Sequence, residues 1–429
     1  MNPFSYGVLE NKKGTLYIAK IPITELVEKF GTPLYVTDEN RLRANLRRLF
    51  TTFTKNYKKM RIYYAAKANS NISILKIFHE ESAYLDAASP GEIFLSLKAG
   101  FPPEKIMFTG TSVSKEELEY ALQEKVVINV DSTSQLKTIL KMQTPELLSL
   151  RLNPEIGSGH HEHVITGGRD SKFGLWEKDA LEAYKTAKEA GVKQFGAHMH
   201  IGSGILKIDP FIDALRNFME IITRIREKAE INFAFIDIGG GLGVPYRLEE
   251  EELNLQECAL KITSIFKRAL QKHQLGDPFL CIEPGRYLVS DSTILLTKAQ
   301  RVKKTPYKNF IGVDAGFNTL IRPAMYGSYH HILAANKLND KAVKKYDIVG
   351  PLCESGDFIG KERKLPNISE GDVLAILNAG AYGYSMSSQY NSRPRPAEVL
   401  AKDGKYEIIR ERETLINLVN GQKVASWLN

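Results

Sequence analysis

From about residue 33 to residue 283 the chain alternates short apolar runs with longer stretches in which apolar residues recur every three or four positions. The longer stretches predict helices, for example at 114–124, 178–190, 210–228 and 255–273. The short runs predict strands at 62–66, 84–88, 105–109, 126–130, 147–152, 195–201, 233–238 and 279–283. This alternation favours a (β/α)8 barrel of the TIM type. A doubly wound open sheet is the alternative, but such sheets usually have fewer strands and a glycine-rich first turn, which the sequence lacks.

Beyond residue 283 the pattern changes to short apolar runs without long helices between them. Turns rich in glycine and proline separate runs at 294–300, 309–314, 345–349, 372–379, 397–401 and 406–410. These predict an antiparallel, partly closed β domain. The early run at 15–19 has the same character and is expected to pair with it. We therefore expect a barrel over 31–284 and a β-rich domain built from 1–30 and 285–429.

Composition narrows the function classes. The chain has 43% hydrophobic and 25% charged residues, and its net charge of +8 is scattered, with only Lys303-Lys304 adjacent beside Lys298 and Arg301. Nucleic-acid binding needs a basic patch or stripe and is not expected. Membrane association is not expected either, because no run approaches the ~18 apolar residues of a span. Three cysteines without CxxC spacing and an N-terminus without a signal-peptide pattern predict a cytoplasmic protein without disulfides or structural zinc.

Candidate chemistry begins at Lys67, which ends the first predicted barrel strand within the run 64–69. Barrel active sites lie at the C-terminal ends of the strands, so this lysine can point into a pocket. Burial there would free its amine for imine chemistry. Most lysines at strand ends are simply solvated, so the interpretation depends on the residues at the ends of the other strands.

Two glycine-containing turns come after the seventh and eighth predicted strands. The run Gly239-Gly240-Gly241-Leu242-Gly243 lacks dinucleotide-binding spacing, and Glu283-Pro284-Gly285-Arg286 comes after the last strand. Barrels frequently bind phosphate in these two loops, so both turns, with Ser203 after the sixth strand, predict a phosphate site.

Histidines mark the sixth strand and one loop. His198 and His200 are two positions apart and share one face of a strand, which a metal pair would also require. No third ligand stands at a helpful spacing, so a core or ring-stacking histidine is favoured and no metal is expected. His160, His161 and His163 lie in a long loop after the fifth strand and are interpreted as loop surface.

Together these residues match what pyridoxal 5′-phosphate (PLP) requires. Lys67 would bind the aldehyde, His200 would lie against the ring, and Glu283 would keep the pyridine nitrogen protonated. The phosphate candidates are Ser203, Gly240, Gly241, Gly285 and Arg286.

The chain resembles the fold-type III PLP-dependent decarboxylases, in the branch that acts on diaminopimelate, from about residue 30 to residue 425. The shared motifs stand at 64–69, 200–204, 239–243, 283–286, 353–357, 379–383 and 390–394. Features that resemble the diaminopimelate branch are Thr166-Gly167 with 171–174, Arg322 with Tyr326, and Cys353-Glu354. One departure is Ala87-Ala88 and Pro90 within the run 86–92, which keeps Asp86, Ser89 and Glu92.

The resemblance implies decarboxylation of meso-2,6-diaminopimelate to L-lysine and CO2, with Asp86 among the cofactor-binding residues. It implies a head-to-tail homodimer in which Cys353, the candidate proton donor, and Tyr382 reach the partner's active site. Glu354 would bind the distal ammonium of the substrate, and Arg286, Arg322 and Tyr326 its distal carboxylate.

Four alternatives stay open at this point. A decarboxylase of ornithine, arginine or lysine would leave the two arginines without an anionic partner, which is costly if they are buried. An amino-acid racemase is disfavoured because a carboxylate at the pyridine nitrogen makes a strong electron sink. A non-catalytic PLP-binding protein would not need the β domain, and a metal-dependent barrel hydrolase is the remaining alternative.

Overall fold

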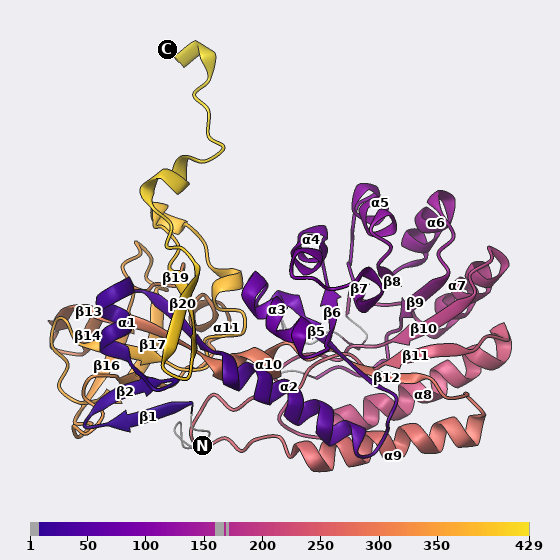
Figure 1. Cartoon of the computed structure of the whole chain (residues 1–429), viewed down its shortest axis with the longest axis horizontal. Helices are drawn as coiled ribbons and strands as arrows, with labels where there is room; N and C mark the ends of the chain where they lie inside the picture. Colours follow the sequence, from indigo (N-terminus) through magenta and orange to yellow (C-terminus); the bar gives the residue numbers. More distant parts are fainter. Residues whose placement is uncertain (1–7, 159–166, 169–170, 429) are drawn as a thin grey trace. The chain divides into compact units, whose positions relative to one another are not determined.

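The computed structural model describes residues 8–158, 167–168 and 171–428. The chain forms two compact units (Figure 1). The barrel unit contains 42–245 and 251–289, and the β unit contains 1–41, 246–250 and 290–429.

The barrel unit is built around a closed ring of parallel strands in the order β10-β11-β12-β5-β6-β7-β8-β9. All eight strands predicted from the sequence are confirmed. Their bounds are β5 (Met60–Ala65), β6 (Tyr84–Ala87), β7 (Ile106–Phe108), β8 (Val127–Val130), β9 (Leu147–Arg151), β10 (Gln194–His198), β11 (Phe233–Asp237) and β12 (Phe279–Ile282).

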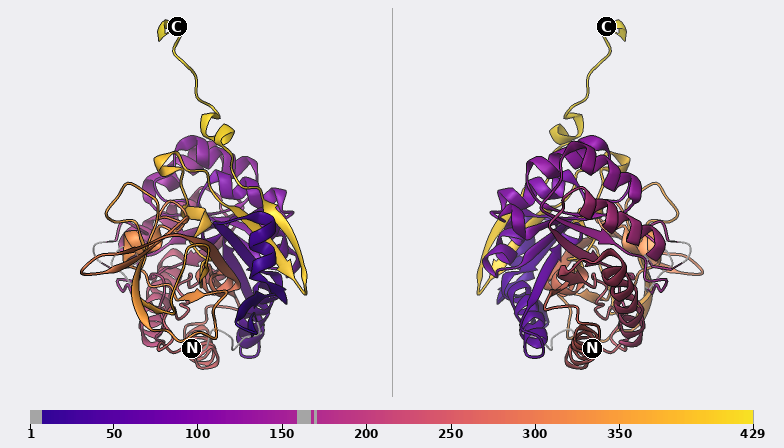
Figure 2. Two further views of the ribbon diagram at one scale, coloured as in Figure 1. Left: turned by 90° about the vertical axis from the view of Figure 1, so that its left-hand side faces the viewer. Right: turned by 90° about the vertical axis from the view of Figure 1, so that its right-hand side faces the viewer.

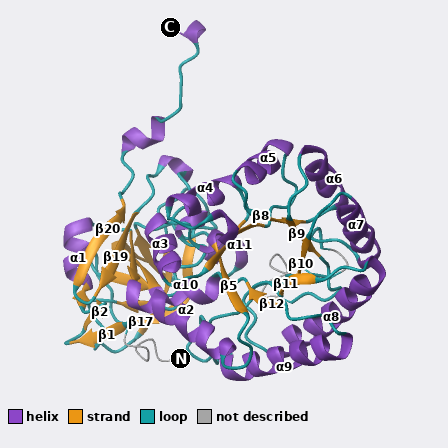
Figure 3. Cartoon of the chain, turned by 45° about the vertical axis from the view of Figure 1, so that its right-hand side comes forward, coloured by secondary structure: helices purple, strands orange, loops and turns teal. Residues whose placement is uncertain are grey.

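Helices surround this ring (Figure 3). They are α2 (Glu39–Thr54), α3 (Ile72–Glu80), α4 (Pro90–Lys98), α5 (Lys115–Gln123), α6 (Thr133–Met142), α7 (Glu177–Glu189), α8 (Asp209–Ala229), α9 (Leu255–His273) and the short α10 (Arg286–Val289). Side-chain caps explain where several begin. Asn71, Ser89, Ser114, Ser132 and Asn254 each accept a hydrogen bond from a backbone N–H in the first turn.

The barrel interior is layered. Tyr63, Met107, Phe235 and Cys281 form a buried apolar cluster, and the ring of Phe235 fills the space left by Gly196, whose Cβ would lie 2.2 Å from it. Strand side chains alternate between faces, so residues two positions further along β11 and β12 share the inward face. The layer above this apolar floor is polar, and it carries the candidate site.

The β unit contains a nine-stranded, mostly antiparallel sheet, so the predicted combination of a TIM-type barrel with a β domain is confirmed. The pairs β14–β16 and β4–β19 are parallel. The strands are β4 (Leu34–Asp38), β13 (Thr293–Lys304), β14 (Asn309–Val313), β15 (Ile332–Ala334), β16 (Lys344–Val349), β17 (Phe358–Leu365), β18 (Val373–Ile376), β19 (Ala397–Lys402) and β20 (Lys405–Arg410). Helices α1 (Ile23–Phe30) and α11 (Arg322–Tyr326) also belong to this unit.

Two details differ from the expectation. Strand β4 pairs with β13 and β19, so the barrel unit begins after it rather than at residue 31. All five residues of β4 are buried, which gives it the uniform pattern of a barrel strand. The run at 15–19 forms β2 (Thr15–Ile18), which pairs with β1 (Leu9–Lys12) and β3 (Ile21–Pro22) in a separate three-stranded sheet rather than with the large one.

Candidate active site

Lys67 and Asp86 form an ion pair at the ends of neighbouring strands. Lys67 follows β5 in a single 3₁₀ turn, Ala66–Ala68, and its Nζ lies 3.0 Å from Asp86 Oδ2. The Asp86 side chain is fully buried, whereas 41% of the Lys67 side chain is exposed. Thr109, just after β7, donates its hydroxyl to the other Asp86 oxygen. The carboxylate is therefore fixed on both sides, and it holds an accessible amine at the mouth of the barrel.

His200, two residues beyond β10, accepts a hydrogen bond at Nδ1 from the backbone N–H of Gly240 at 3.0 Å. Burial lowers the pKa of this imidazole well below its usual range, and the charges of Arg151 and Lys67 lower it further. Both observations describe a neutral ring that carries its proton on Nε2. A neutral, fixed imidazole at this position is suited to packing against a planar ligand.

The glycine run is required by close backbone approach. A Cβ on Gly240 would lie 2.2 Å from the carbonyl oxygen of Glu283, and one on Gly239 would lie 2.3 Å from that of Met199. Gly239 also has a φ of +71°. The Gly240 N–H is donated to His200 and the space beside Gly240 is filled by the Glu283 carbonyl, so both contacts are made within the protein.

The side chains of Arg286 and Ser203 are in contact although they lie far apart in the sequence. The buried guanidinium of Arg286, the first residue of α10, donates to Ser203 Oγ from Nη2 at 3.1 Å and from Nε at 3.3 Å. Gly285 brings α10 close to the Lys67 turn, since a Cβ there would lie 3.1 Å from Ala68 Cβ. A cation and a hydroxyl thus stand together in the region where the sequence predicted phosphate.

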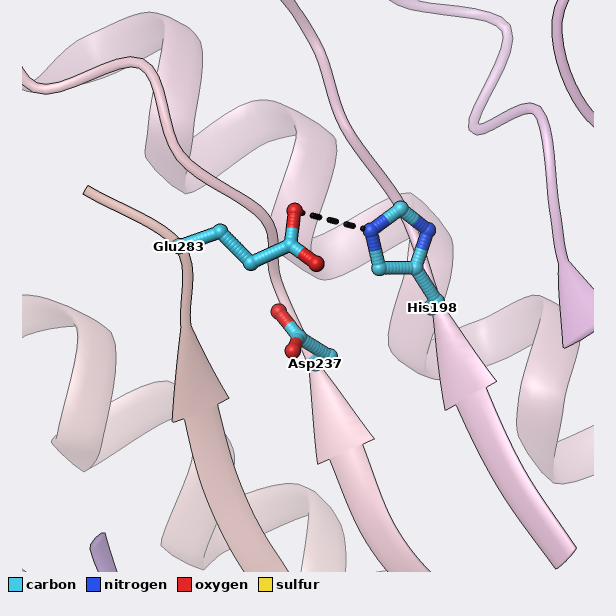
Figure 4. A group of neighbouring side chains, drawn as sticks. All are labelled: His198, Asp237 and Glu283. Atoms are coloured by element: carbon cyan, nitrogen blue, oxygen red, sulfur yellow. Dashed lines mark hydrogen bonds and ion pairs between the residues drawn. The ribbon is translucent and has the colours of Figure 1, made fainter. Parts of the chain in front are cut away.

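Three side chains from adjacent strand ends form the most buried part of the site (Figure 4). They are His198, Asp237 and Glu283, each no more than 5% exposed. His198 Nε2 lies 3.1 Å from Glu283 Oε2, and Asp237 Oδ1 accepts the N–H of Gly239 at 2.7 Å. Among the described residues, Glu283 Oε1, Asp237 Oδ2 and His198 Nδ1 have no hydrogen-bond partner.

The surroundings shift the pKa values of the two carboxyl groups of this cluster in opposite directions. Burial, reinforced by the charge of Glu283, raises the pKa of Asp237 well above its usual range. Burial also opposes ionisation of Glu283, but His198, Lys67 and Arg151 together outweigh it and lower its pKa. These opposite shifts favour a proton on Asp237 and a charge on Glu283, to which His198 would donate from Nε2. An ionised carboxylate with one oxygen still able to accept a hydrogen bond matches a protonated ring nitrogen.

The predicted histidine pair does not form a shared site, because His198 bonds to Glu283 and His200 to Gly240. Within the described part of the chain, the group able to surround a metal is His198, Asp237 and Glu283, whose ligand atoms lie within 4.8 Å of one another. Within this group His198 Nε2 and Glu283 Oε2 are paired at 3.1 Å. His160, His161, His163 and Thr166 lie outside the described residues.

The sequence interpretation missed two members of the site, Arg151 and Asp237. Arg151, the last residue of β9, is 7% exposed and packs over the ring of Phe173 at 4.4 Å. It faces the charges of Asp131, Glu283 and Asp86, although burial lowers its pKa. In both cases the sequence feature that could have identified the residue is a charged side chain at the last position of a buried strand.

The β unit carries the other predicted residues. Arg322, the first residue of α11, is 1% exposed and donates from Nη1 to Tyr246 Oη at 3.0 Å and from Nη2 to Ser328 Oγ at 3.2 Å. His330 Nε2 lies 3.3 Å from Arg322 Nη1, and Tyr326 ends the same helix, partly buried. Tyr246, Ser328 and His330 therefore help to orient this buried cation.

Cys353 and Glu354 lie on an exposed loop of the same unit. Asn391 Oδ1 accepts the Cys353 backbone N–H at 2.8 Å, and Tyr390 Oη donates to Glu354 Oε1 at 2.9 Å. Tyr382 is partly buried and has a φ of +58°. The segment 390–391 thus supports the Cys353–Glu354 loop, while the barrel residues form their own group in the other unit.

Comparison with known proteins identifies the family. Residues 43–290 match the model of the pyridoxal-dependent decarboxylases, pyridoxal binding domain. The chain is 52% identical to the diaminopimelate decarboxylase of Methanothermobacter thermautotrophicus over 97% of this chain and 98% of that protein. The chain belongs to the diaminopimelate decarboxylase family of pyridoxal-dependent decarboxylases.

Other relatives agree with this assignment. The diaminopimelate decarboxylase of Archaeoglobus fulgidus is 41% identical over 97% of this chain and 98% of that protein. The crystal structure of a family member from M. jannaschii in complex with L-lysine superposes with a TM-score of 0.91 at 35% identity, covering 98% of this chain and 99% of that one.

Proposed function

We propose that this enzyme is a PLP-dependent carboxy-lyase that converts meso-2,6-diaminopimelate to L-lysine and CO2, the last step of lysine biosynthesis. The observation that carries the proposal is the buried Glu283, hydrogen-bonded to His198 at 3.1 Å in the same barrel mouth as the Lys67–Asp86 pair. The names of the relatives supply the substrate, and the bound L-lysine of the M. jannaschii structure is the expected product.

The residues of the barrel mouth fit the cofactor. Lys67 would hold its aldehyde carbon through Nζ, with Asp86 as the counter-charge at 3.0 Å. Glu283 would accept from the ring nitrogen and His200 would pack on the ring. Arg286 and Ser203 would bind the phosphate, with Gly240, Gly241 and Gly285 as the further candidates around it. Tyr382 of the partner subunit would complete the cofactor site.

Bound PLP supplies an electron sink for the electron pair left when CO2 departs. The protein must keep the ring nitrogen of the cofactor protonated and must later return a proton to the substrate Cα. An ionised Glu283 would keep the ring nitrogen protonated, since a charged acceptor favours the protonated form. We assign the return of the proton to Cys353 of the partner subunit, whose thiol stands on the exposed loop.

Selectivity would come from side chains of the β unit together with Arg286 of the barrel unit. The non-reacting end of diaminopimelate carries both an ammonium and a carboxylate. Glu354 would bind the former, while Arg322, Tyr326 and Arg286 would bind the latter. Ornithine lacks the distal carboxylate, so it could not make the contacts proposed for Arg322, Tyr326 and Arg286. The alternative of another basic amino acid is therefore disfavoured.

The working unit we propose is a head-to-tail homodimer located in the cytoplasm. Its test is subunit mixing. Lys67→Ala and Cys353→Ala homodimers should each be inactive, and their mixture should recover about a quarter of wild-type activity, because half of the random dimers carry one intact site. Absence of recovery in a mixture that does exchange subunits would place both residues in one subunit's site.

Cofactor attachment tests the barrel assignment separately. Lys67→Ala should abolish the visible absorbance of the bound cofactor and CO2 release from diaminopimelate, whereas Lys115→Ala, an exposed lysine at the start of α5, should change neither.

Among the described residues, no helix is long and apolar enough to cross a bilayer.

A further inference from the structure

The last described residues, 414–428, expose an unusual amount of apolar surface. Figures 1 and 2 show this segment, hereafter the C-terminal segment, running away from β19 and β20. Its exposed apolar side chains are Leu415 (72% exposed), Ile416 (73%), Val419 (59%), Val424 (72%), Trp427 (83%) and Leu428 (70%). Together they present several hundred Å² of apolar surface, an extent that marks an interaction site rather than ordinary exposed residues.

The C-terminal segment has local order but makes no hydrogen bond to the rest of the described chain. Thr414 and Asn417 form a capping box at the start of the turn Leu415–Val419, and a second turn covers Ser426–Leu428. The remaining hydrogen bonds also connect neighbours, such as Gln422 with Leu418 and Leu428 N with Ala425 O. Short turns of this kind bury little apolar area by themselves, so their side chains need a second surface.

The base of the segment is firmly anchored, which fixes where it leaves the β unit. Glu413 Oε1 accepts from Arg395 Nε at 2.8 Å, and Glu413 Oε2 accepts from Gln389 Nε2 at 2.8 Å. Burial opposes ionisation of Glu413, but these partners prevail and lower its pKa to about 2. Arg412 also donates to the backbone oxygen of Pro33 at 2.7 Å.

This anchor is continuous with the loop that we place at the partner's active site. Gln389, which binds Glu413, directly precedes Tyr390 and Asn391, which bind Glu354 and the Cys353 backbone. The C-terminal segment thus starts beside the part of the β unit assigned to the subunit interface. Its 15 described residues would reach up to about 50 Å if fully extended and less with the two turns they contain.

We infer that the C-terminal segment docks on a second copy of this chain, packing its apolar side chains against the partner and strengthening the dimer. The inference rests on the proposed homodimer. A standard interface buries about 800 Å² on each partner, and two-fold symmetry would supply the segment twice. A lipid surface fits less well, since Lys423 is the only charged residue in 414–429 and interfacial helices carry a basic face.

The test compares the dimer dissociation constants of full-length variants and a truncation by sedimentation. Deleting 415–429 should weaken the dimer by roughly 100-fold or more, because large aromatic and aliphatic anchors dominate interfaces. Since a truncation can misfold, the double variant Trp427→Ser with Leu428→Ser is measured beside it and should weaken the dimer about tenfold or more. The matched control is Tyr307→Ser, which removes an exposed aromatic (93% exposed) outside the segment and should leave the dimer unchanged.

The outcomes separate the two proposals. An equally tight dimer in the truncated and double variants would overturn the docking of the C-terminal segment and leave the homodimer intact. A monomeric, active wild-type chain would overturn the homodimer itself. A photo-crosslinker at position 427 should join two copies of the chain. Trp427-dependent binding to vesicles of phosphatidylserine and phosphatidylcholine, with no effect on the dimer, would instead make the segment a membrane contact.

Discussion

The neutral state of Asp237 and the ionised state of Glu283 predict opposite responses to isosteric amidation. The ligand oxygens of the two carboxyl groups lie within 4.8 Å. At an effective dielectric constant of about 20, two negative charges at that separation repel by about 3.5 kcal/mol, which opposes ionisation of the second group. Burial assigns the proton of the pair to Asp237.

Glu283→Gln removes the charge that holds the ring nitrogen. A hydrogen bond to a charged group contributes about 1.5–3 kcal/mol, so cofactor affinity should fall roughly 10- to 100-fold, and kcat/KM should fall with it. Asp237→Asn keeps an acceptor for the Gly239 N–H and places an amide donor where the acid carried its proton. Its affinity loss should stay below about 1 kcal/mol.

The assay is titration of cofactor-free enzyme with PLP, followed by protein fluorescence, together with kcat/KM for diaminopimelate. The nitrogen-15 chemical shift of isotopically labelled PLP reports ring protonation directly. It should match the wild type in Asp237→Asn and move toward the unprotonated value in Glu283→Gln. If Asp237→Asn proved as damaging as Glu283→Gln in both readouts, the assignment of charge within the cluster would be wrong.

Individual contacts give three further predictions. Gly240→Ala should destabilise the barrel unit by about 3–5 kcal/mol, because its Cβ would lie 2.2 Å from the Glu283 carbonyl, whereas Gly91→Ala, with Ser89 Oγ at 3.7 Å, should be nearly neutral; denaturant midpoints test this. Burial and the charge of Arg363 lower the pKa of His331 to about 4. As the pH falls from 6.5 to 4 the unfolded chain takes up the proton first, so the free energy of unfolding of the β unit should decrease by up to about 3 kcal/mol. The variant His331→Gln should show a smaller decrease in acid melting curves. Arg322→Lys should raise KM for diaminopimelate about tenfold or more, and equal KM values would remove its role.

The sequence predicted the barrel because each strand is a short apolar run followed by a helix of clear period. No strand was predicted at 34–38, where β4 lies, and its pairing with β13 and β19 assigns it to the β unit. Four of the eight residues of β17 are charged and three of these are exposed, so β17 lacked a sequence signal.

The candidate site was accessible from the sequence wherever a residue comes directly after a strand. Lys67, His200, Glu283 and Arg286 were identified in this way, and their roles stay predictions until tested. The contact between His198 and Glu283 was not accessible, because it depends on the register of β10, β11 and β12. Gly240 was predicted as part of a phosphate cradle, whereas its contacts with His200 and the Glu283 backbone are sufficient to require glycine.

The central claim is tested most directly by a product assay. Purified enzyme with PLP is given meso-diaminopimelate, L-lysine, L-ornithine or L-arginine separately, and CO2 and the amine products are quantified. The account predicts CO2 and L-lysine from diaminopimelate and no release from the other three. Release from ornithine or arginine, with none from diaminopimelate, would leave the cofactor site standing and contradict the roles of Glu354, Arg322 and Tyr326 in selecting the substrate.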